Sequence, residues 1–140
     1  MRHLFFISLL GFISPHAVSS DSIVVVANTQ HTSIKLSRQE IRNLFMGGAL
    51  SSLSYDLRAI ALPPENQTRV KFNTKVIGLT ESRIQSYWAQ MRFSGRKKPP
   101  TELSNETLVI EYLQNNPGSV AYLPVDTEIP IGLTVLFQSN

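Results

Sequence analysis

Hydroxyl, amide and guanidinium side chains gather in two segments of the sequence, and each segment follows an expected β-strand. The first, Asn28–Ser33, follows the β-branched run Ser22–Ala27, and the second, Pro63–Arg69, follows Leu57–Leu62. Such donors, with the free N–H groups of a helix start, bind phosphate and other small oxyanions. Because ligands in open α/β sheets collect beyond the carboxyl ends of strands, the two segments are expected to face each other. The candidate ligand-binding residues are Thr29, Thr32, Ser33, Asn66, Thr68 and Arg69. The alternative is that they are helix caps and loop residues with no ligand.

The densest positive charge in the chain lies shortly after Trp88, which is its only tryptophan. Arg92 comes first, and Arg96, Lys97 and Lys98 follow in a loop that two prolines close. An acidic or phosphate-bearing surface of another molecule would suit this charge. We therefore take Arg96, Lys97 and Lys98 as candidate partner-binding residues, with a solvated loop as the alternative.

Patterns typical of catalysis and metal binding are missing from the sequence. It has no Gly-x-Ser-x-Gly, Gly-x-x-x-x-Gly-Lys or Gly-x-Gly-x-x-Gly motif. Cysteine is absent, which excludes disulfides, zinc–thiolate sites and thiol catalysis. His31 is the only histidine after the first 19 residues, and no two carboxylates have a spacing that implies shared work. We expect no enzymatic activity, no cofactor and no metal site.

The first residues have the pattern of a secretory signal peptide. Arg2 precedes the apolar run Leu4–Ile13, and Ala17–Ser19 offers the small residues of a cleavage site. The apolar run is shorter than the about 20 residues that a spanning helix needs. We therefore expect a signal peptide over residues 1–19 and a domain over residues 20–140, located in the periplasm without membrane insertion after cleavage.

Composition agrees with one globular domain that does not bind nucleic acid. Hydrophobic residues make up 42% of the 140 residues and charged residues 16%, which is too apolar for disorder. The formal net charge of +3 falls to +2 without Arg2. So small a charge argues against nucleic acid as a partner, but it is compatible with a local anion site.

Helix and strand signals alternate along the mature chain. The clearest is Ser37 three residues before Glu40, a capping box that predicts a helix over Arg38–Met46. Further helices are expected after the caps Asn66, Thr80 and Ser104, and strands at Ser22–Ala27, Leu57–Leu62, Ser119–Leu123 and Gly132–Phe137. This order predicts a single three-layer α/β sandwich with a mixed, mainly parallel sheet.

The helix after Thr80 carries a continuous apolar stripe. Ile84, Tyr87, Trp88 and Met91 stand at i, i+3, i+4 and i+7. We interpret the stripe as a face packed into the core. The alternative is that Trp88 is a stacking platform for a ligand ring.

Four segments carry a family resemblance. They are Leu36–Gly47, Phe72–Gly78, Tyr87–Gly95 with Pro99-Pro100, and Asn116–Tyr122. In order and spacing they resemble the phosphate-binding proteins of bacterial phosphate ABC transporters, which are type II periplasmic binding proteins. The resemblance implies the fold of one lobe of such a protein, with phosphate or another small oxyanion as ligand. In the family's anion loop an arginine stands shortly before Ser-Gly-Thr, and in the corresponding stretch only Thr68 matches.

The residues leave two functions open. The leading hypothesis is a periplasmic solute-binding-type module that binds phosphate or another small oxyanion for an ABC transport system. The alternative is a ligand-free protein-interaction module of the same fold, acting with a periplasmic sensor or envelope complex.

Overall fold

The structure is a computed structural model that describes Gly11, residues 21–50 and residues 55–140. Apart from Gly11, the expected signal peptide over residues 1–19 lies outside the described residues, and so does the stretch 51–54. In the described ranges, no helix is both long and apolar enough to cross a membrane.

Five strands in the described part of the chain form one sheet, in the order β3-β2-β4-β1-β5. They are β1 (Ile23–Ala27), β2 (Arg58–Ala61), β3 (Thr101–Glu102), β4 (Ser119–Pro124) and β5 (Thr134–Gln138). β2 runs parallel to β3 and β4, whereas β1 runs antiparallel to β4 and β5. The sheet is mixed, as predicted, but parallel pairs do not form the expected majority. The reason is that β4 and β5, from the end of the chain, flank β1 and both run opposite to it.

The helices begin close to the residues that local signals predict. They are α1 (Arg38–Phe45), α2 (Gln67–Phe72) with its π-helical continuation η1 (Asn73–Ile77), α3 (Glu81–Phe93) and α4 (Glu106–Asn115). The capping box of Ser37 and Glu40 is present, and Asn66 and Thr80 cap α2 and α3 as expected. Asn105 rather than Ser104 caps α4, because its side chain accepts the N–H of Leu108.

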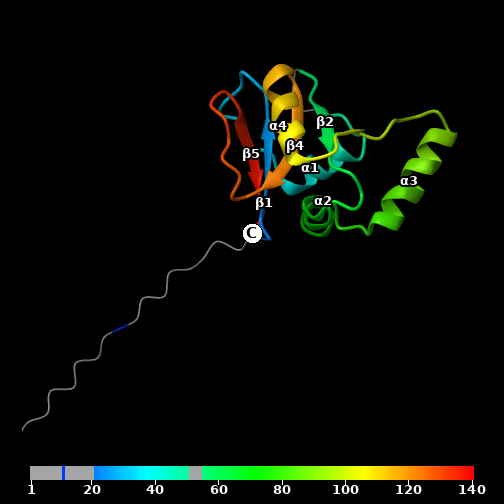
Figure 1. Cartoon of the computed structure of the whole chain (residues 1–140). Helices are drawn as coiled ribbons and strands as arrows, with labels where there is room; N and C mark the ends of the chain where they lie inside the picture. The colour runs from blue at the N-terminus through cyan, green and yellow to red at the C-terminus, as the bar shows by residue number, and fades with distance from the viewer. Residues whose placement is uncertain (1–10, 12–20, 51–54) are drawn as a thin grey trace, which may run out of the picture.

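The core lies on both faces of the sheet. All of β1 is buried, which explains its unbroken apolar sequence. On one face, Tyr122 of β4 stacks on Phe72 of α2 with ring centroids 3.9 Å apart, and Phe45 of α1 meets Phe72 edge-on at 4.8 Å. Val109 and Leu113 of α4 are buried, and α4 packs against β4. Figure 1 shows α4 on one side of the sheet and α1 with α2 on the other, which gives the predicted three layers.

Helix α3 lies beside this sandwich rather than over the sheet (Figure 1). Ile84 and Trp88 are buried, and Trp88 is only 4% exposed, as core packing predicts. The Tyr87 hydroxyl donates a hydrogen bond of 2.7 Å to the carbonyl of Met46, at the end of α1. One face of α3 is therefore fixed to the end of α1, and the opposite face stays in solvent.

Candidate functional site

The two segments that carry the candidate ligand-binding residues lie at opposite ends of the sheet. The N–H of Asn28, after β1, donates to Ser119 at the start of β4, and the N–H of Arg58, which starts β2, donates to Gly118. The end of β1 therefore lies at the same end of the sheet as the beginning of β2, with β4 between the two strands. The prediction that the two segments face each other is wrong, because the rule on which it rests holds for strands that run in the same direction.

The first segment forms a turn at the surface. The hydroxyl of Thr29 accepts the N–H of His31 at 3.1 Å, and the His31 ring stacks on Tyr55 with centroids 4.2 Å apart. Thr32 and Ser33 are exposed. These residues therefore do not come together with Asn66, Thr68 and Arg69.

In the second segment, Asn66 and Thr68 hydrogen-bond a carboxylate of the protein itself. The Asn66 side-chain oxygen accepts the N–H groups of Thr68 and Arg69, as a helix cap does. The Asn66 amide and the Thr68 hydroxyl both donate to Oε1 of Glu106, at 3.2 Å and 2.8 Å. Burial acts to raise the pKa of Glu106, but the hydrogen bond from Thr68 and those from its own backbone N–H and Asn66 lower it below its usual value. Glu106 thus presents a carboxylate to the donors that were expected to bind an oxyanion.

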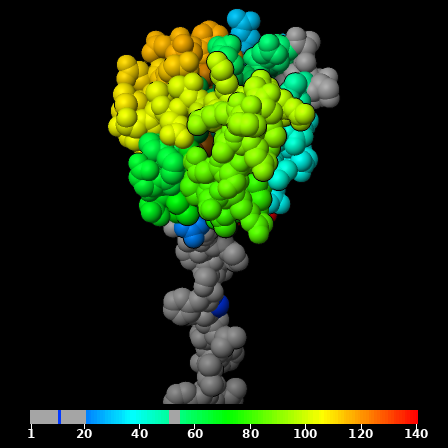
Figure 2. Space-filling model, turned by 90° about the vertical axis from the view of Figure 1, so that its right-hand side faces the viewer, coloured from blue at the N-terminus to red at the C-terminus, as the bar shows by residue number. Residues whose placement is uncertain are grey.

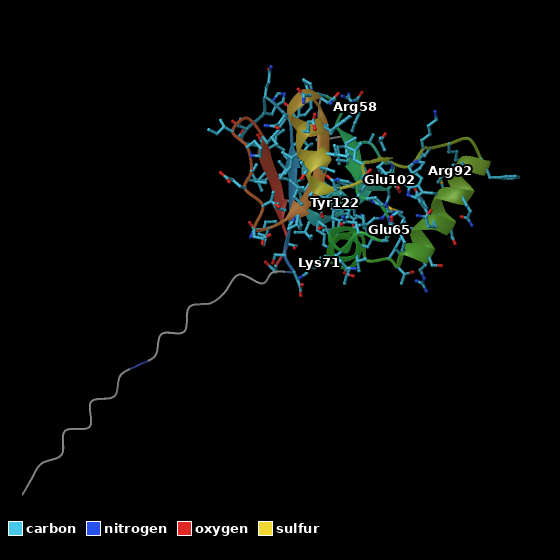
Figure 3. The ribbon with its side chains drawn as sticks, in the orientation of Figure 1. Arg58, Glu65, Lys71, Arg92, Glu102 and Tyr122 are labelled. Atoms are coloured by element: carbon cyan, nitrogen blue, oxygen red, sulfur yellow. The ribbon has the colours of Figure 1, made fainter. Side chains whose placement is uncertain are left out.

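Arg69 also binds two further carboxylates, those of Glu81 and Glu102. Its guanidinium makes two bonds to Glu81, at 2.6 Å and 2.9 Å, one to Glu102 at 2.9 Å and one to the carbonyl of Leu62 at 2.7 Å. These bonds use four of the five N–H donors of the side chain. Glu102 extends from β3 on the side of the sheet that faces α3 (Figure 3). Arg69 therefore connects α2, α3, β2 and β3.

The charge of Glu81 is stabilised by this arrangement. Burial acts to raise the pKa of Glu81, but hydrogen bonds from Arg69, Gln85 and Asn73, with the positive charge of Arg69, lower it below its usual value. The pKa of Arg69 is raised even though burial acts to lower it, because Glu81 and Glu102 surround the guanidinium. Near neutral pH Glu81 is therefore ionised and Arg69 is protonated, and the two charges neutralise each other.

A small cavity lies between α3 and the body of the domain. Phe45, Phe72, Trp88 and Tyr122 contribute to its walls. It offers about 60 Å³ to water-sized molecules, whereas an engineered apolar cavity that binds benzene measures about 150 Å³. The Tyr122 hydroxyl accepts the N–H of Leu62 at 3.0 Å, and burial raises the pKa of this phenol. The cavity has room for a few water molecules, and the burial of Trp88 favours core packing over a stacking platform.

The candidate partner-binding residues lie together at the far end of α3. Arg92, Phe93, Arg96, Lys97 and Lys98 are all exposed, and we call this surface the α3 tip. Figure 2 looks onto the face of the domain that α3 and the following loop form. In the part of the chain that the structure describes, none of the four cations of the α3 tip has a carboxylate within 4.0 Å.

Within residues 21–50 and 55–140, no group of three or more histidine, aspartate or glutamate side chains is arranged to hold a metal ion. The carboxylates that do gather, Glu81, Glu102 and Glu106, face Arg69, Asn66 and Thr68 instead.

Comparisons with known proteins support the fold. No protein-family model matches the chain, and no curated protein matches it. Among solved structures, an ABC-type phosphate transport receptor from Vibrio cholerae matches 82% of this chain with a TM-score of 0.59 and 11% identity. PstS from Borrelia burgdorferi also matches 82% of it, with a TM-score of 0.59 and 12% identity. The chain covers only 45% and 46% of these two proteins. It therefore has the fold of one part of these receptors, as the sequence motifs led us to expect.

Proposed function

We propose that this chain is a periplasmic protein-interaction module built on a binding-protein-like fold, and that it holds no oxyanion at the segment Asn66–Arg69. The observation that carries the proposal is that each of the three candidate side chains in that segment donates to a carboxylate of the same chain. Arg69 binds Glu81 and Glu102, and Asn66 and Thr68 bind Glu106.

The energetics support this proposal. Phosphate at this place would have to displace Glu81 and Glu102 from Arg69 and would therefore replace existing ion pairs instead of adding new ones. It would also bring negative charge close to Glu81, Glu102 and Glu106, which repel it. Micromolar affinity requires about 8 kcal/mol of net binding free energy. Donors that already make hydrogen bonds within the protein can contribute little of this binding free energy to an anion.

A second candidate is the leading hypothesis of the sequence, a module that binds phosphate or another small oxyanion for transport. The similarity to proteins described as phosphate transport receptors favours it. Because the chain spans less than half of those receptors, an oxyanion site in it would have to be built from this single part or completed by another protein.

Isothermal titration of the mature domain, from residue 20 onward, separates the two candidates. Phosphate, sulfate and succinate are titrated at neutral pH into protein whose folded state is checked by Trp88 fluorescence. We expect no binding heat from any of the three. Saturable one-to-one binding of phosphate or sulfate in the micromolar range, lost in Arg69→Met, would refute the proposal and establish the second candidate.

A further inference from the structure

The α3 tip combines an exposed aromatic side chain with uncompensated positive charge. Phe93 is 97% exposed, far more than Val70 and Leu108, at 46% and 41%. Arg92 and Arg96 stand on either side of Phe93 in the sequence, and Lys97 and Lys98 follow at once. A fully exposed phenyl ring among four cations buries no apolar surface in the domain itself. Aromatic and arginine side chains of this kind are enriched at the centres of protein interfaces.

Backbone hydrogen bonds fix the shape of the α3 tip. The N–H groups of Ser94, Gly95 and Arg96 donate to the carbonyls of Gln90, Arg92 and Met91, each at 3.1 Å. Gly95 has φ of 66°, a left-handed conformation that ends the helix at little cost because glycine has no Cβ. The chain thus leaves α3 through a closed turn, and Phe93 is presented from the last helical turn.

The loop after this turn is also held against the domain. At Gly47, an added Cβ would come within 3.0 Å of the Lys97 side chain and 3.1 Å of the Trp88 ring. The aliphatic part of Lys97 therefore lies against the end of α1, while the Lys97 residue as a whole stays exposed. A surface that is ordered before binding loses little conformational entropy when a partner docks.

We propose that the α3 tip docks a protein whose acidic surface surrounds an apolar pocket, with Phe93 in the pocket and Arg92, Arg96 and Lys98 at its charged rim. This inference rests on the proposed function and names its surface and the chemistry of its partner. A protein suits the α3 tip better than a lipid bilayer does, because one fixed aromatic side chain offers little to insert. Fixed charges around a single aromatic anchor match the anatomy of a protein interface.

Site-specific photo-crosslinking in the cells that make the protein tests this docking surface. The full chain carries p-benzoyl-phenylalanine in place of Phe93 or, as a matched control, in place of Ile131, which is 104% exposed on the loop before β5. Each is combined with the charge reversal Arg96→Glu/Lys98→Glu. The matched control for this reversal is Lys35→Glu/Arg38→Glu, which changes the net charge by the same amount at exposed positions outside the α3 tip. Cross-linked peptides are identified by mass spectrometry.

We expect a defined protein product from position 93, cross-linked at a surface where acidic residues outnumber basic ones. The Arg96→Glu/Lys98→Glu pair should lower its yield at least about tenfold, while the Lys35→Glu/Arg38→Glu pair leaves it unchanged. A product that forms equally from position 131, or that resists the charge reversal, overturns the inference.

Three further outcomes also overturn it and identify what replaces it. A product between two copies of this chain would mean self-association. A lipid product, with sedimentation of the purified protein on vesicles of equal parts phosphatidylglycerol and phosphatidylcholine, would mean membrane docking. A partner captured from position 131 alone would move the interface elsewhere and leave the proposed function standing, because the anion titration decides that function independently.

Discussion

Replacing Arg69 is the most direct test of how this fold uses its buried charge. The Arg69 side chain is 8% exposed and joins Glu81 of α3 to Glu102 of β3. Arg69→Met keeps a long apolar side chain in place and removes the guanidinium. If Arg69 serves to join the elements of the fold, the variant has a lower free energy of unfolding, and its affinity for anions does not change. If it is an anion-binding residue, the variant loses a ligand instead.

The expected magnitude follows from the exposure of the two carboxylates. Removing one partner of a buried ion pair costs about 3–5 kcal/mol, because the other charge stays unpaired. Glu81 and Glu102 keep 28% and 43% of their side-chain surface in water, so the unpaired carboxylates are partly hydrated. The free energy of unfolding should therefore fall by about 3 kcal/mol, at the lower end of that range. For a domain of this size the melting temperature should fall by about 10 °C.

Urea denaturation followed by Trp88 fluorescence and by circular dichroism measures this loss. A double-mutant cycle with Glu81→Gln isolates the pair itself, and we expect a coupling free energy of about 2 kcal/mol. Arg83→Met is the matched control, because Arg83 is exposed on α3, the helix that carries Glu81, and it should change stability by less than about 0.5 kcal/mol.

Two results would refute the reasoning. One is an Arg69→Met variant as stable as the control variant, which would mean that the guanidinium is not held by its carboxylates in solution. The other is a wild-type melting temperature that rises with phosphate while that of Arg69→Met does not. That second result would mean that an anion competes successfully with Glu81 and Glu102.

Three further predictions concern the stability of the same domain. Trp88→Ala should cost about 3–5 kcal/mol in urea denaturation followed by circular dichroism, because Trp88 is 4% exposed; wild-type-like stability would contradict its place in the core. Gly47→Ala should cost about 1–3 kcal/mol in thermal melts, because Gly47 has φ of 83° and the added Cβ meets Lys97 and Trp88; an unchanged melting temperature would argue against that conformation. Folding lowers the pKa values of Glu81 and Glu106. Their contribution to stability is therefore complete at pH values above the unfolded pKa of about 4.3, and it is lost as the pH falls through the folded pKa values. Urea midpoints between pH 7 and pH 3 should fall with acidity in the wild type and more shallowly in Glu106→Gln, and parallel curves would contradict the assignment.

Local features could be predicted from the sequence because their signals lie within a few residues. Ser37 and Glu40 form the capping box that their spacing indicates. Asn66 and Thr80 cap helices, and Trp88 is buried on the face that the stripe defines. The two-residue strand β3 has no comparable signal, because it is too short for an alternating pattern and is defined by its pairing with β2.

Features that depend on strand direction could not be predicted from the same signals. The order of strands and helices along the chain is compatible with β1 running either way beside β4. The structure makes it antiparallel, and this single choice separates Thr29, Thr32 and Ser33 from Arg69.

The carboxylates that engage the candidate donors were also missed. Glu81, Glu102 and Glu106 are 12, 33 and 38 residues from the groups they bind, so no spacing rule connects them. An isolated glutamate in a sequence usually lies at the surface, so nothing marks these three as partners of the candidate donors. The one general signal is that a buried charge requires a partner, so burial of Arg69 implies that acidic side chains lie close to it.

The same requirement decides which charges of this domain are available to another molecule. Arg69 is buried, so the fold must supply it with carboxylates, and those carboxylates then oppose any anion at that end of the sheet. Lys98 and the arginines of the α3 tip lie in water and require no such partner, and among the described residues none of them has a carboxylate within 4.0 Å. A domain that uses its buried donors for its own stability can recognise a charged partner only through cations of this second kind. Binding by this domain should therefore weaken with added salt, since exposed charges are screened within about 10 Å at 0.1 M ionic strength.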